Sequence, residues 1–512
     1  MRKGGRGPSL QPSALLSAKV VRSARFDVVE SKVRRITVHV LCGKARAHSW
    51  VSMVLRTRVF ARPIEIHVDA LALLASRESD FSIAFLDGNE GTARSRFSFL
   101  GVRPVERRSL RGDEDSDVYF DGLDAHAGEV GGELIAGLPN ARIPRWIGSI
   151  SYDYAWARMP ALGLRRGPHR ARDSSRLHAH FDRFDALLVS DRVSGLVHAV
   201  GDSEEALDRL SKDIDSMRRG PQSSVLVGAV EAESRALHGE AITQALRHIA
   251  DGDIYQINLA RRWRAHYEGS PHAARALARA MRKASPVPFG ALLEAPDGSA
   301  LVARTMETFL EWDRTTRTLT TRPIKGTIAR LGEETGEVSL RADTKERAEH
   351  AMIVDLMRND LGRLAETGSV RVQGAFTVEP YARLSHLVST VCATTLPEVN
   401  LRTLLDGTFP PGSITGTPKL AAMELIEKLE RHPRGFYTGC VGYIDQAGGV
   451  SFAVAIRTAQ LAHGVLDYFA GGGIVDASVV ASEVEETALK ALVFTESCRA
   501  LALASAAASA FE

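Results

Sequence analysis

The C-terminal half of the sequence alternates between strand-like and helical segments, and this alternation limits the folds available to the chain. Residues 234–250 repeat the apolar residues Leu237, Ile242, Leu246 and Ile249 at helical spacing. DIYQINLARRWRAHY then alternates like a strand, and after a second helical segment come the strand-like runs FGALLEA and ALVARTMETFLEW. No glycine fingerprint of a dinucleotide site and no solenoid repeat is visible. The pattern therefore argues against a doubly wound nucleotide-binding fold and a repeat array.

The N-terminal half has a mixed pattern that ends at a linker-like segment. Between residues 61 and 228, strand-like runs such as SRFSFLGVRPV and DALLVSDRVSGLVHAV alternate with loops rich in Gly, Asp and Arg. The segment MRRGPQSSVLVGAVEAES, with its Gly-Pro pair and two serines, is typical of a linker. We therefore expect an N-terminal region at 61–228 and a second, catalytic region at 229–505.

The first 60 residues differ in charge from the rest of the chain. They hold thirteen Lys and Arg residues against two Asp and Glu residues, so the remainder of this chain of net charge +3 carries −8. Such an N-terminus is typical of a nucleic-acid-binding arm, an organelle transit peptide, or a start codon assigned too far upstream. We favour the last interpretation, because domain-like patterning begins near Met53. Residues 1–60 are therefore expected to be a disordered basic extension outside the fold.

Composition limits where the protein acts. With 44% hydrophobic and 25% charged residues, the chain is typical of a globular protein, and no run approaches the roughly 18 apolar residues of a membrane span. Cys42, Cys392, Cys440 and Cys498 show neither zinc-site spacing nor the density of a disulfide framework. We expect a soluble cytoplasmic protein that binds neither membranes nor nucleic acid.

Lys325 lies in the string TLTTRPIKGTIAR, between a strand-like run and a Gly-Thr turn. A lysine is a nucleophile only when its amine has lost its proton, which burial or nearby cations favour. Pro323 and Gly326 could fix the backbone so that Lys325 points inward. On pattern alone, a lysine in such a turn is more often solvated.

Three glutamates lie in two helical segments. Glu349 borders the apolar face of DTKERAEHAMIVDLMRNDLGRL. Glu483 and Glu486 share a helix face with Lys490, because steps of three and seven residues turn about 300° and 700°, and a run of three glycines precedes that helix. Carboxylate oxygens suit magnesium, so these glutamates could form a metal site. For the second helix alone, a solvated face with a Glu486–Lys490 pair is the simpler interpretation.

Taken together and in order, these strings resemble the family of chorismate-utilising enzymes that includes anthranilate synthase component I. The resemblance runs from about Pro63 to Ala500 and rests on GDIYQINL, TRPIKGT, AEHAMIVDLMRNDLGR, LSHLVSTV, FPPGSITGTPKLAAMELI, GFYTGCVGYI, FAVAIRT, and GGGIV followed by SEVEET. It implies an α/β (α+β) fold in which two large β-sheets pack face to face and are flanked by helices. The active site is then expected between the sheets, in the C-terminal region.

The resemblance also implies site residues. Family members bind chorismate with its ring carboxylate on magnesium, which assigns Glu349, Glu483 and Glu486 to the metal and its water shell. The second carboxylate is expected to be held by Tyr443, Arg457, the amides of Gly472 and Gly473, and Lys490. His386 and Thr415 correspond to family positions close to the ring, with a hydrogen-bonded core histidine and a turn threonine as the alternatives.

Lys325 distinguishes branches of this family. Members that form anthranilate have a small residue there, whereas members that add ammonia at C4 of chorismate have lysine. The resemblance implies that Lys325 attacks C2, that Glu307 protonates the departing C4 hydroxyl, and that ammonia then adds at C4 and expels the lysine. The expected activity is this amination, a step toward 4-aminobenzoate and folate. Anthranilate formation, a bifunctional role and a non-catalytic paralogue are the alternatives.

Three strings depart from the family pattern. Thr305 and Met306 precede Glu307 where Ser-Pro is usual, IAFLDGNEG replaces a Leu-Leu-Glu-Ser string associated with tryptophan binding, and Val479-Val480 replaces Asp-Pro. Tryptophan inhibition is therefore not expected. No stretch resembles a glutamine amidotransferase, which implies that a separate amidotransferase subunit supplies the ammonia.

Overall fold

The computed structural model describes residues 59–65, 67, 69–89, 96–112, 114–124, 138, 141–158, 176–269, 272–295, 297–329, 344–380 and 384–509. Residues 1–58, which make up most of the expected basic extension, lie outside the described residues.

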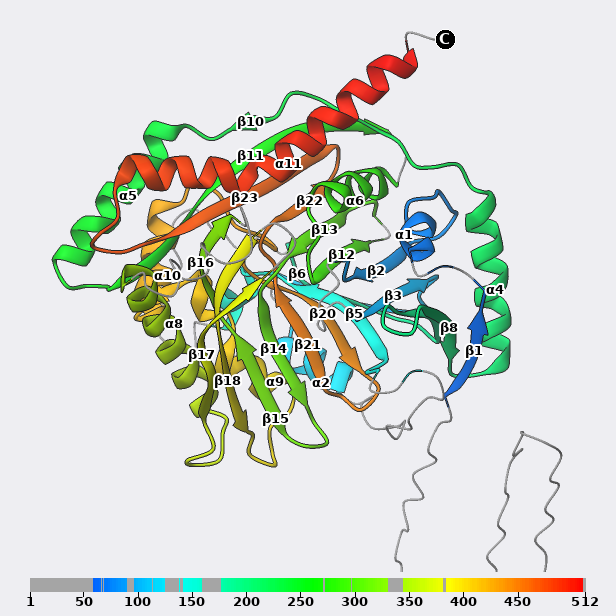
Figure 1. Cartoon of the computed structure of the whole chain (residues 1–512), viewed down its shortest axis with the longest axis horizontal. Coiled ribbons are helices and arrows are strands. Elements are labelled where there is room, and N and C mark those ends of the chain that lie inside the picture. Colours follow the sequence, from blue (N-terminus) through cyan, green and yellow to red (C-terminus); the bar gives the residue numbers. More distant parts are fainter. Residues whose placement is uncertain are drawn as a thin grey trace, which may run out of the picture. The chain divides into compact units, whose positions relative to one another are not determined.

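The first of two large sheets contains thirteen of the described strands, and every pairing in it is antiparallel (Figure 1). Side by side lie β1 (Phe60–Ile64), β8 (Leu196–Gly201), β7 (Ala186–Asp191), β3 (Phe97–Val102), β2 (Ile83–Asp87), β12 (Phe289–Glu294), β13 (Ala300–Thr305), β22 (Thr458–Ala462), β23 (Val465–Ile474), β11 (Gln256–Gly269) and β10 (Glu231–Ala232). The short strands β9 (Val225–Val227) and β19 (Gly416–Thr417) also pair with β11.

The second sheet contains ten of the described strands and is also antiparallel. Its order is β16 (Ile324–Ala329), β18 (Leu384–Thr394), β15 (Thr318–Arg322), β14 (Thr308–Asp313), β21 (Val450–Val454), β20 (Cys440–Asp445), β5 (Pro144–Ile150), β6 (Leu177–Arg183) and β4 (Glu106–Arg111), with β17 (Arg371–Pro380) paired to β18. Both sheets contain strands from before and after residue 228. The expected boundary there stays a prediction.

Apolar side chains from both sheets form one buried cluster. Ala84 and Ala303 from the first sheet pack there with Val441 and Ala453 from the second. Strands such as β2 read as continuous apolar runs because both of their faces are buried. The opposite side of β2, which includes Ile83, packs in a cluster with helical residues. The expected fold of two large sheets flanked by helices is confirmed.

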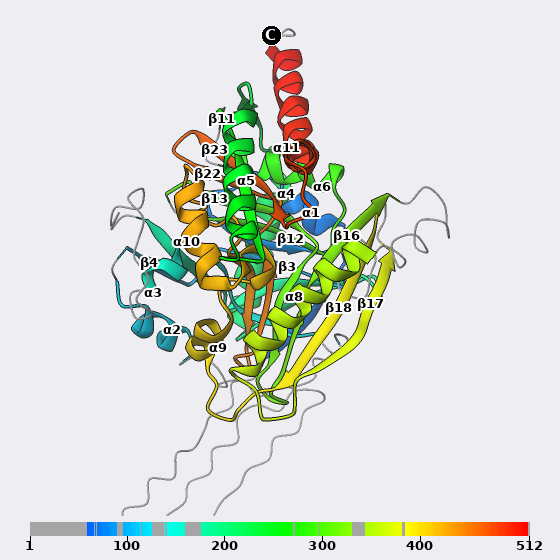
Figure 2. The same ribbon diagram turned by 90° about the vertical axis from the view of Figure 1, so that its left-hand side faces the viewer.

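Helices cover the outer faces of the sheets. The described helices are α1 (Ala70–Leu74), α2 (Ser116–Asp124), α3 (Tyr154–Arg158), α4 (Glu204–Arg219), α5 (Arg235–Ala250), α6 (Ala273–Ala284), α8 (Thr344–Gly362), α9 (Leu401–Thr408), the 3-10 turn η3 (Gly412–Ile414), α10 (Lys419–Leu429) and α11 (Val480–Ser509). Figure 2 shows α8 along β16, β17 and β18, against which it packs. Among the described helices, none is long and apolar enough to cross a membrane.

Two segments compare directly with the sequence pattern. The helix predicted at 234–250 is α5, which Ser234 caps by accepting a hydrogen bond from the amide of Leu237. The run ALVARTMETFLEW, predicted as one strand, is instead two strands in different sheets. The chain leaves β13 after Thr305 and enters β14 at Thr308. The apolar pattern conceals this break because both strands are buried on both faces, and Glu307 lies at the crossing.

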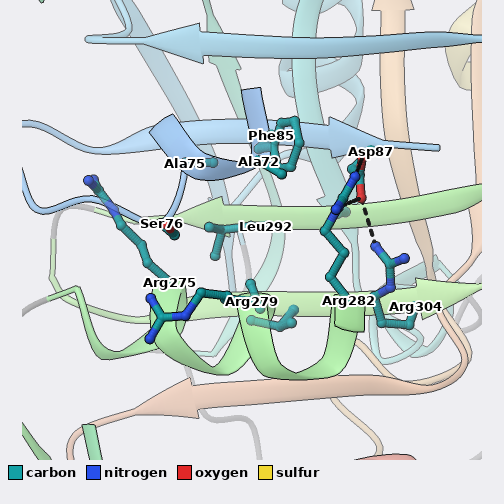
Figure 3. Close-up of a pocket in the computed structure, with 13 residues that line it drawn as sticks. Ala72, Ala75, Ser76, Phe85, Asp87, Arg275, Arg279, Arg282, Leu292 and Arg304 are labelled. Atoms are coloured by element: carbon teal, nitrogen blue, oxygen red, sulfur yellow. Dashed lines mark hydrogen bonds and ion pairs between the residues drawn. The ribbon is translucent and has the colours of Figure 1, made fainter. Parts of the chain in front are cut away.

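Arginines of α6 surround a cavity between this helix and the first sheet (Figure 3). Arg282 and Arg304 donate hydrogen bonds to Asp87. Arg275 is fully buried and forms two hydrogen bonds of 2.8 and 2.7 Å with Glu294. Burial opposes the charge of Glu294, but hydrogen bonds from Arg275 and His272 outweigh it and lower its pKa. This pair therefore fastens α6 to β12.

Replacing Arg275 with Met should lower the free energy of unfolding by about 3 to 5 kcal/mol, because Glu294 would stay buried without its guanidinium partner. Denaturant titration measures this loss. The contribution exists above the ordinary pKa of Glu294 and disappears as the pH falls through its lowered value, so the difference between the proteins should shrink in acid. Arg279→Met on the same helix is the control, because Arg279 forms no ion pair with a described residue. Equal losses in both variants would contradict this role.

Candidate active site

The predicted site residues lie on strands of both sheets, on two helices and on three connecting segments. They are Glu307 between β13 and β14, Lys325 on β16, Glu349 on α8, His386 on β18, Thr415 after η3, Tyr443 on β20, Arg457 before β22, Gly472 and Gly473 on β23, and Glu483, Glu486 and Lys490 on α11.

The amine of Lys325 lies against the backbone of β23. A Cβ atom placed on Gly473 would be 2.8 Å from Lys325 Nζ, so a side chain there would displace the amine from this position. Gly473 is not among the glycines with positive φ, so its role here is to leave space for the amine and not to adopt a special backbone conformation. Lys325 Nζ is also 3.6 Å from Glu349 Oε2, and the two side chains are 19% and 13% exposed. The lysine points inward between the two sheets rather than into solvent.

The first turns of α11 lie over the glycine run of β23. Lys490 Nζ donates to the carbonyl of Gly471 at 2.8 Å and is 2.6 Å from Glu486 Oε1. A Cβ atom on Gly472 would be 3.1 Å from Glu483 Oε2. Side chains of both signs are therefore held directly against this backbone, as the shared helix face of residues 483, 486 and 490 predicts.

Opposite charges determine the electrostatics of this region. Burial opposes the charge of Glu486, but Lys490, Lys325 and Arg457 outweigh it and lower its pKa. Burial lowers the pKa of Lys490, an effect that Arg457 and Lys325 strengthen and Glu486 opposes. Arg457 also donates from Nη1 to the backbone carbonyl of Lys490 at 3.0 Å. The three cations therefore lie close enough together to act on the same carboxylate, that of Glu486.

The three glutamates expected to bind magnesium each have a protein partner. Glu349 faces Lys325, Glu486 pairs with Lys490, and Glu483 accepts a 2.7 Å hydrogen bond from Ser478 Oγ. Within the described ranges, no three Asp, Glu, His or Cys side chains are placed to hold one ion. The donor chemistry fits magnesium, which prefers carboxylates and keeps several positions for water and substrate. The residues do not form a complete cage.

Glu307 is a buried acid at the crossing between the sheets. The residue is 6% exposed, and its Oε1 accepts a 2.5 Å hydrogen bond from Ser413 Oγ. Burial raises the pKa of Glu307 to about 7, although Ser413 and Lys325 act in the opposite direction. The group can therefore hold a proton near neutral pH and release it to a substrate, as a general acid must.

His386 and Thr415 are both buried and hydrogen bonded to the protein backbone. Nδ1 of His386 donates to the carbonyl of Gly326 at 3.3 Å, and burial lowers its pKa to about 4, so the ring is neutral at pH 7. Because His386 pairs with Thr327 across β18 and β16, it lies near Lys325 in the sheet. The hydroxyl of Thr415 bonds to the carbonyl of Gly412 within its own turn.

Tyr443 and the glycine run lie in different surroundings. The ring of Tyr443 packs edge-on against Phe99, with centroids 5.4 Å apart, in the apolar layer between the sheets. Tyr437, six residues earlier, is the tyrosine that reaches β23, because its Oη would be 2.9 Å from a Cβ atom on Gly471. The described contacts therefore bring Tyr437, and not Tyr443, to the glycine run.

Gln256 is a second residue that the sequence pattern did not single out. It begins β11, and its Nε2 would lie 3.2 Å from a Cβ atom on Gly473, beside Lys325. Its Oε1 is buried without a hydrogen-bond partner among the described residues. Gln256 and Tyr437 belong to the strings GDIYQINL and GFYTGCVGYI, so their neighbourhood was visible in the sequence although their orientation was not.

Comparison with known proteins assigns the family. Residues 84–496 match the model of a family described as chorismate binding enzyme. Aminodeoxychorismate synthase component 1 of Klebsiella aerogenes is 42% identical over 258 residues, which cover 50% of this chain and 56% of that protein. Anthranilate synthase component 1 of Streptomyces coelicolor is 32% identical over 440 residues, covering 80% and 82% of the two chains.

A solved structure shows the same fold. Anthranilate synthase component I from Streptococcus pneumoniae TIGR4 superposes with a TM-score of 0.64 and 27% identity, covering 78% of this chain and 92% of that one. The match to the Klebsiella aerogenes protein spans little more than half of that protein's length. The family model, however, covers most of this sequence. The chain therefore belongs to the chorismate binding enzyme family.

Proposed function

We propose that the chain is component I of an aminodeoxychorismate synthase, which converts chorismate and ammonia to 4-amino-4-deoxychorismate. The observation that carries this proposal is the placement of Lys325, whose amine lies between the sheets against Gly473. The charge of the same lysine acts on the buried acid Glu307 and opposes the rise in its pKa that burial causes. A nucleophile and a proton donor are the two groups that this substitution requires. The name of the Klebsiella aerogenes relative supports the same assignment.

The proposed reaction exchanges the C4 hydroxyl for an amine in two displacements. The neutral amine of Lys325 forms a bond to C2, the ring double bonds shift, and the C4 hydroxyl leaves as water with the proton of Glu307. Ammonia then forms a bond to C4, the double bonds shift back, and Lys325 leaves C2. The balance is chorismate plus ammonia giving 4-amino-4-deoxychorismate plus water, with the extra proton of the added ammonia returning to Glu307.

Charge balance supports the binding of a dianion together with magnesium. Glu349, Glu483 and Glu486 supply three negative charges, whereas Lys490 and Arg457 supply two positive charges beside the neutral Lys325 that the reaction requires. A protonated Glu307 adds no charge, so with the two carboxylates of chorismate three negative charges would be uncompensated. A magnesium ion bound by carboxylates of this set, with water and the ring carboxylate completing its coordination, would supply two positive charges. Lys490, Arg457, the amides of Gly472 and Gly473, and the hydroxyl of Tyr437 are the proposed donors to the other carboxylate.

Anthranilate formation is the second candidate, because the Streptomyces coelicolor relative, matched over most of both chains, is an anthranilate synthase component 1. In that reaction ammonia attacks C2 directly as the C4 hydroxyl leaves as water, without a lysine nucleophile, and loss of pyruvate then gives anthranilate. For either reaction we propose that a separate glutamine amidotransferase subunit supplies the ammonia, and that the protein acts in the cytoplasm.

Chorismate and magnesium without ammonia should leave Lys325 covalently modified, because the second displacement cannot occur. Mass spectrometry of the digested protein should show the Lys325 peptide with the added mass of chorismate less one water. Lys325→Ala should form no adduct and lose at least about 100-fold in 4-amination, as expected for loss of a covalent catalyst. It should still bind chorismate, because the proposed carboxylate donors lie elsewhere.

The exposed Lys428 on α10 supplies the matched control. Lys428→Ala should keep both the adduct and the wild-type rate. A Lys325→Ala enzyme that makes 4-amino-4-deoxychorismate at the wild-type rate would remove the basis of the proposal.

Turnover should require magnesium, and Glu483→Gln or Glu486→Gln should weaken magnesium-dependent binding of chorismate, because each change removes a carboxylate donor. Calorimetric titration of chorismate with and without the metal measures this. Unfolding should change by less than about 0.5 kcal/mol, since these side chains lie outside the apolar core. Glu485→Gln on the same helix, whose exposed carboxylate pairs with Arg235, is the control. Full turnover in excess chelator would contradict the metal site.

A further inference from the structure

We propose that Ser413 is a positioning residue for the general acid Glu307, and that it determines which carboxyl oxygen carries the proton. This inference rests on the proposed function, in which Glu307 protonates the departing hydroxyl. The two residues are 106 positions apart in the chain, and Ser413 lies in the η3 turn between α9 and α10. Their contact is therefore made by the fold and not by local sequence.

Hydrogen bonds fix Glu307 at its backbone and at one carboxyl oxygen. Its amide donates to Thr305 Oγ1 at 3.3 Å, and its carbonyl accepts from the amide of Val454 at 3.0 Å. Oε1 accepts from Ser413 Oγ at 2.5 Å. Oε2 accepts no hydrogen bond from the described residues. Because Oε1 accepts the hydrogen bond from the Ser413 hydroxyl, we expect the proton of the neutral carboxylic acid to be on Oε2.

A buried ion pair holds one end of the segment that carries Ser413. Lys419 Nζ is 2.6 Å from Asp360 Oδ2 on α8 and also donates to the carbonyls of Thr408 and Pro410, at 3.2 and 3.1 Å. The Asp360 side chain is 5% exposed and that of Lys419 is 16% exposed, so the pair lies in a low-dielectric interior. A single ammonium group thereby joins α8 to the end of α9 and to the start of the Ser413 segment.

Backbone contacts hold the other end of this segment. Arg434, which is fully buried, donates from Nη1 to the carbonyl of Ile414 at 3.1 Å. The amide of Asn258 donates to the carbonyl of Thr415 at 2.8 Å, and β19 pairs with β11 directly afterwards. The residues on both sides of Ser413 are therefore hydrogen bonded to other elements, which fixes the backbone that presents its hydroxyl to Glu307.

The sign of the electrostatic effect follows from the hydrogen bond. A hydroxyl that donates to a carboxylate favours its ionised form, so Ser413 opposes the rise in the pKa of Glu307 that burial causes. Lys325 on β16 is the described charged residue that acts on Glu307 in the same direction as Ser413. Loss of the Ser413 hydroxyl should raise the pKa of Glu307 further, which makes it a weaker proton donor that is also free to rotate.

The test is the pH dependence of kcat/KM for chorismate, measured with magnesium and a fixed concentration of free ammonia. For the wild type, kcat/KM should fall as the pH rises through about 7, the pKa of free Glu307. In Ser413→Ala this basic limb should move upward by roughly one pH unit, and kcat should fall about 10-fold or more. Ser413→Thr, which keeps the hydroxyl, should have the basic limb and the kcat of the wild type.

Ser223→Ala is the matched control, because it also deletes a buried hydroxyl, one that donates to the carbonyl of Ser76. It should leave the pH profile unchanged. If Ser413→Ala does not fold, Ser413→Cys, whose thiol is a weaker donor, should show a smaller shift in the same direction. A folded variant without the hydroxyl whose basic limb and kcat match the wild type would overturn the role of Ser413. A wild-type protein that does not consume chorismate would instead overturn the proposed function.

Discussion

The lack of a side chain at Gly473 allows the Lys325 amine to reach the backbone of β23, and the proposed chemistry depends on this approach. Lys325 belongs to the ten-stranded sheet, whereas Gly473 belongs to the thirteen-stranded sheet. Their proximity therefore requires the two sheets to pack face to face, as the shared cluster of Ala84, Ala303, Val441 and Ala453 shows. Interiors of this kind are closely packed, so the position of the amine is set by the whole sandwich rather than by its own loop.

The crossing between the sheets determines where Glu307, the proposed general acid, lies. Because β13 and β14 lie in different sheets, Glu307 has to be where the chain passes from one to the other. That passage is buried, and burial is what raises the pKa of Glu307 to about 7. The cation Lys490 lies on α11, and Arg457 lies directly before β22. Arg457 donates a hydrogen bond to the backbone carbonyl of Lys490, which holds the two residues together. The proposed nucleophile, the proposed acid and the proposed carboxylate donors thus come from separate elements that meet only in the folded protein.

The sequence was most informative where one local segment determines the outcome. Periodicity predicted α5 and the shared face of Glu483, Glu486 and Lys490, and the ordered family strings predicted the two large sheets. It failed where the outcome depends on contacts between distant segments. The break at Met306 lies inside an apolar run that reads as one strand, because a strand buried on both faces looks the same in either sheet.

Side-chain direction was the second kind of information that the pattern could not supply. Tyr437 and Tyr443 occur in the same string, and the structure alone shows that Tyr437 reaches Gly471. Ser413 occurs in FPPGSITGTPK with nothing local to connect it to Glu307. Thr415, two residues later, directs its hydroxyl into its own turn.

Identification of the reaction product is the decisive test of whether this chain aminates chorismate at C4. The purified protein would be incubated with chorismate, magnesium and ammonium salt, and the products separated and identified by mass spectrometry and comparison with authentic standards. We expect 4-amino-4-deoxychorismate as the main product. Anthranilate as the sole product, or unchanged chorismate, would contradict it.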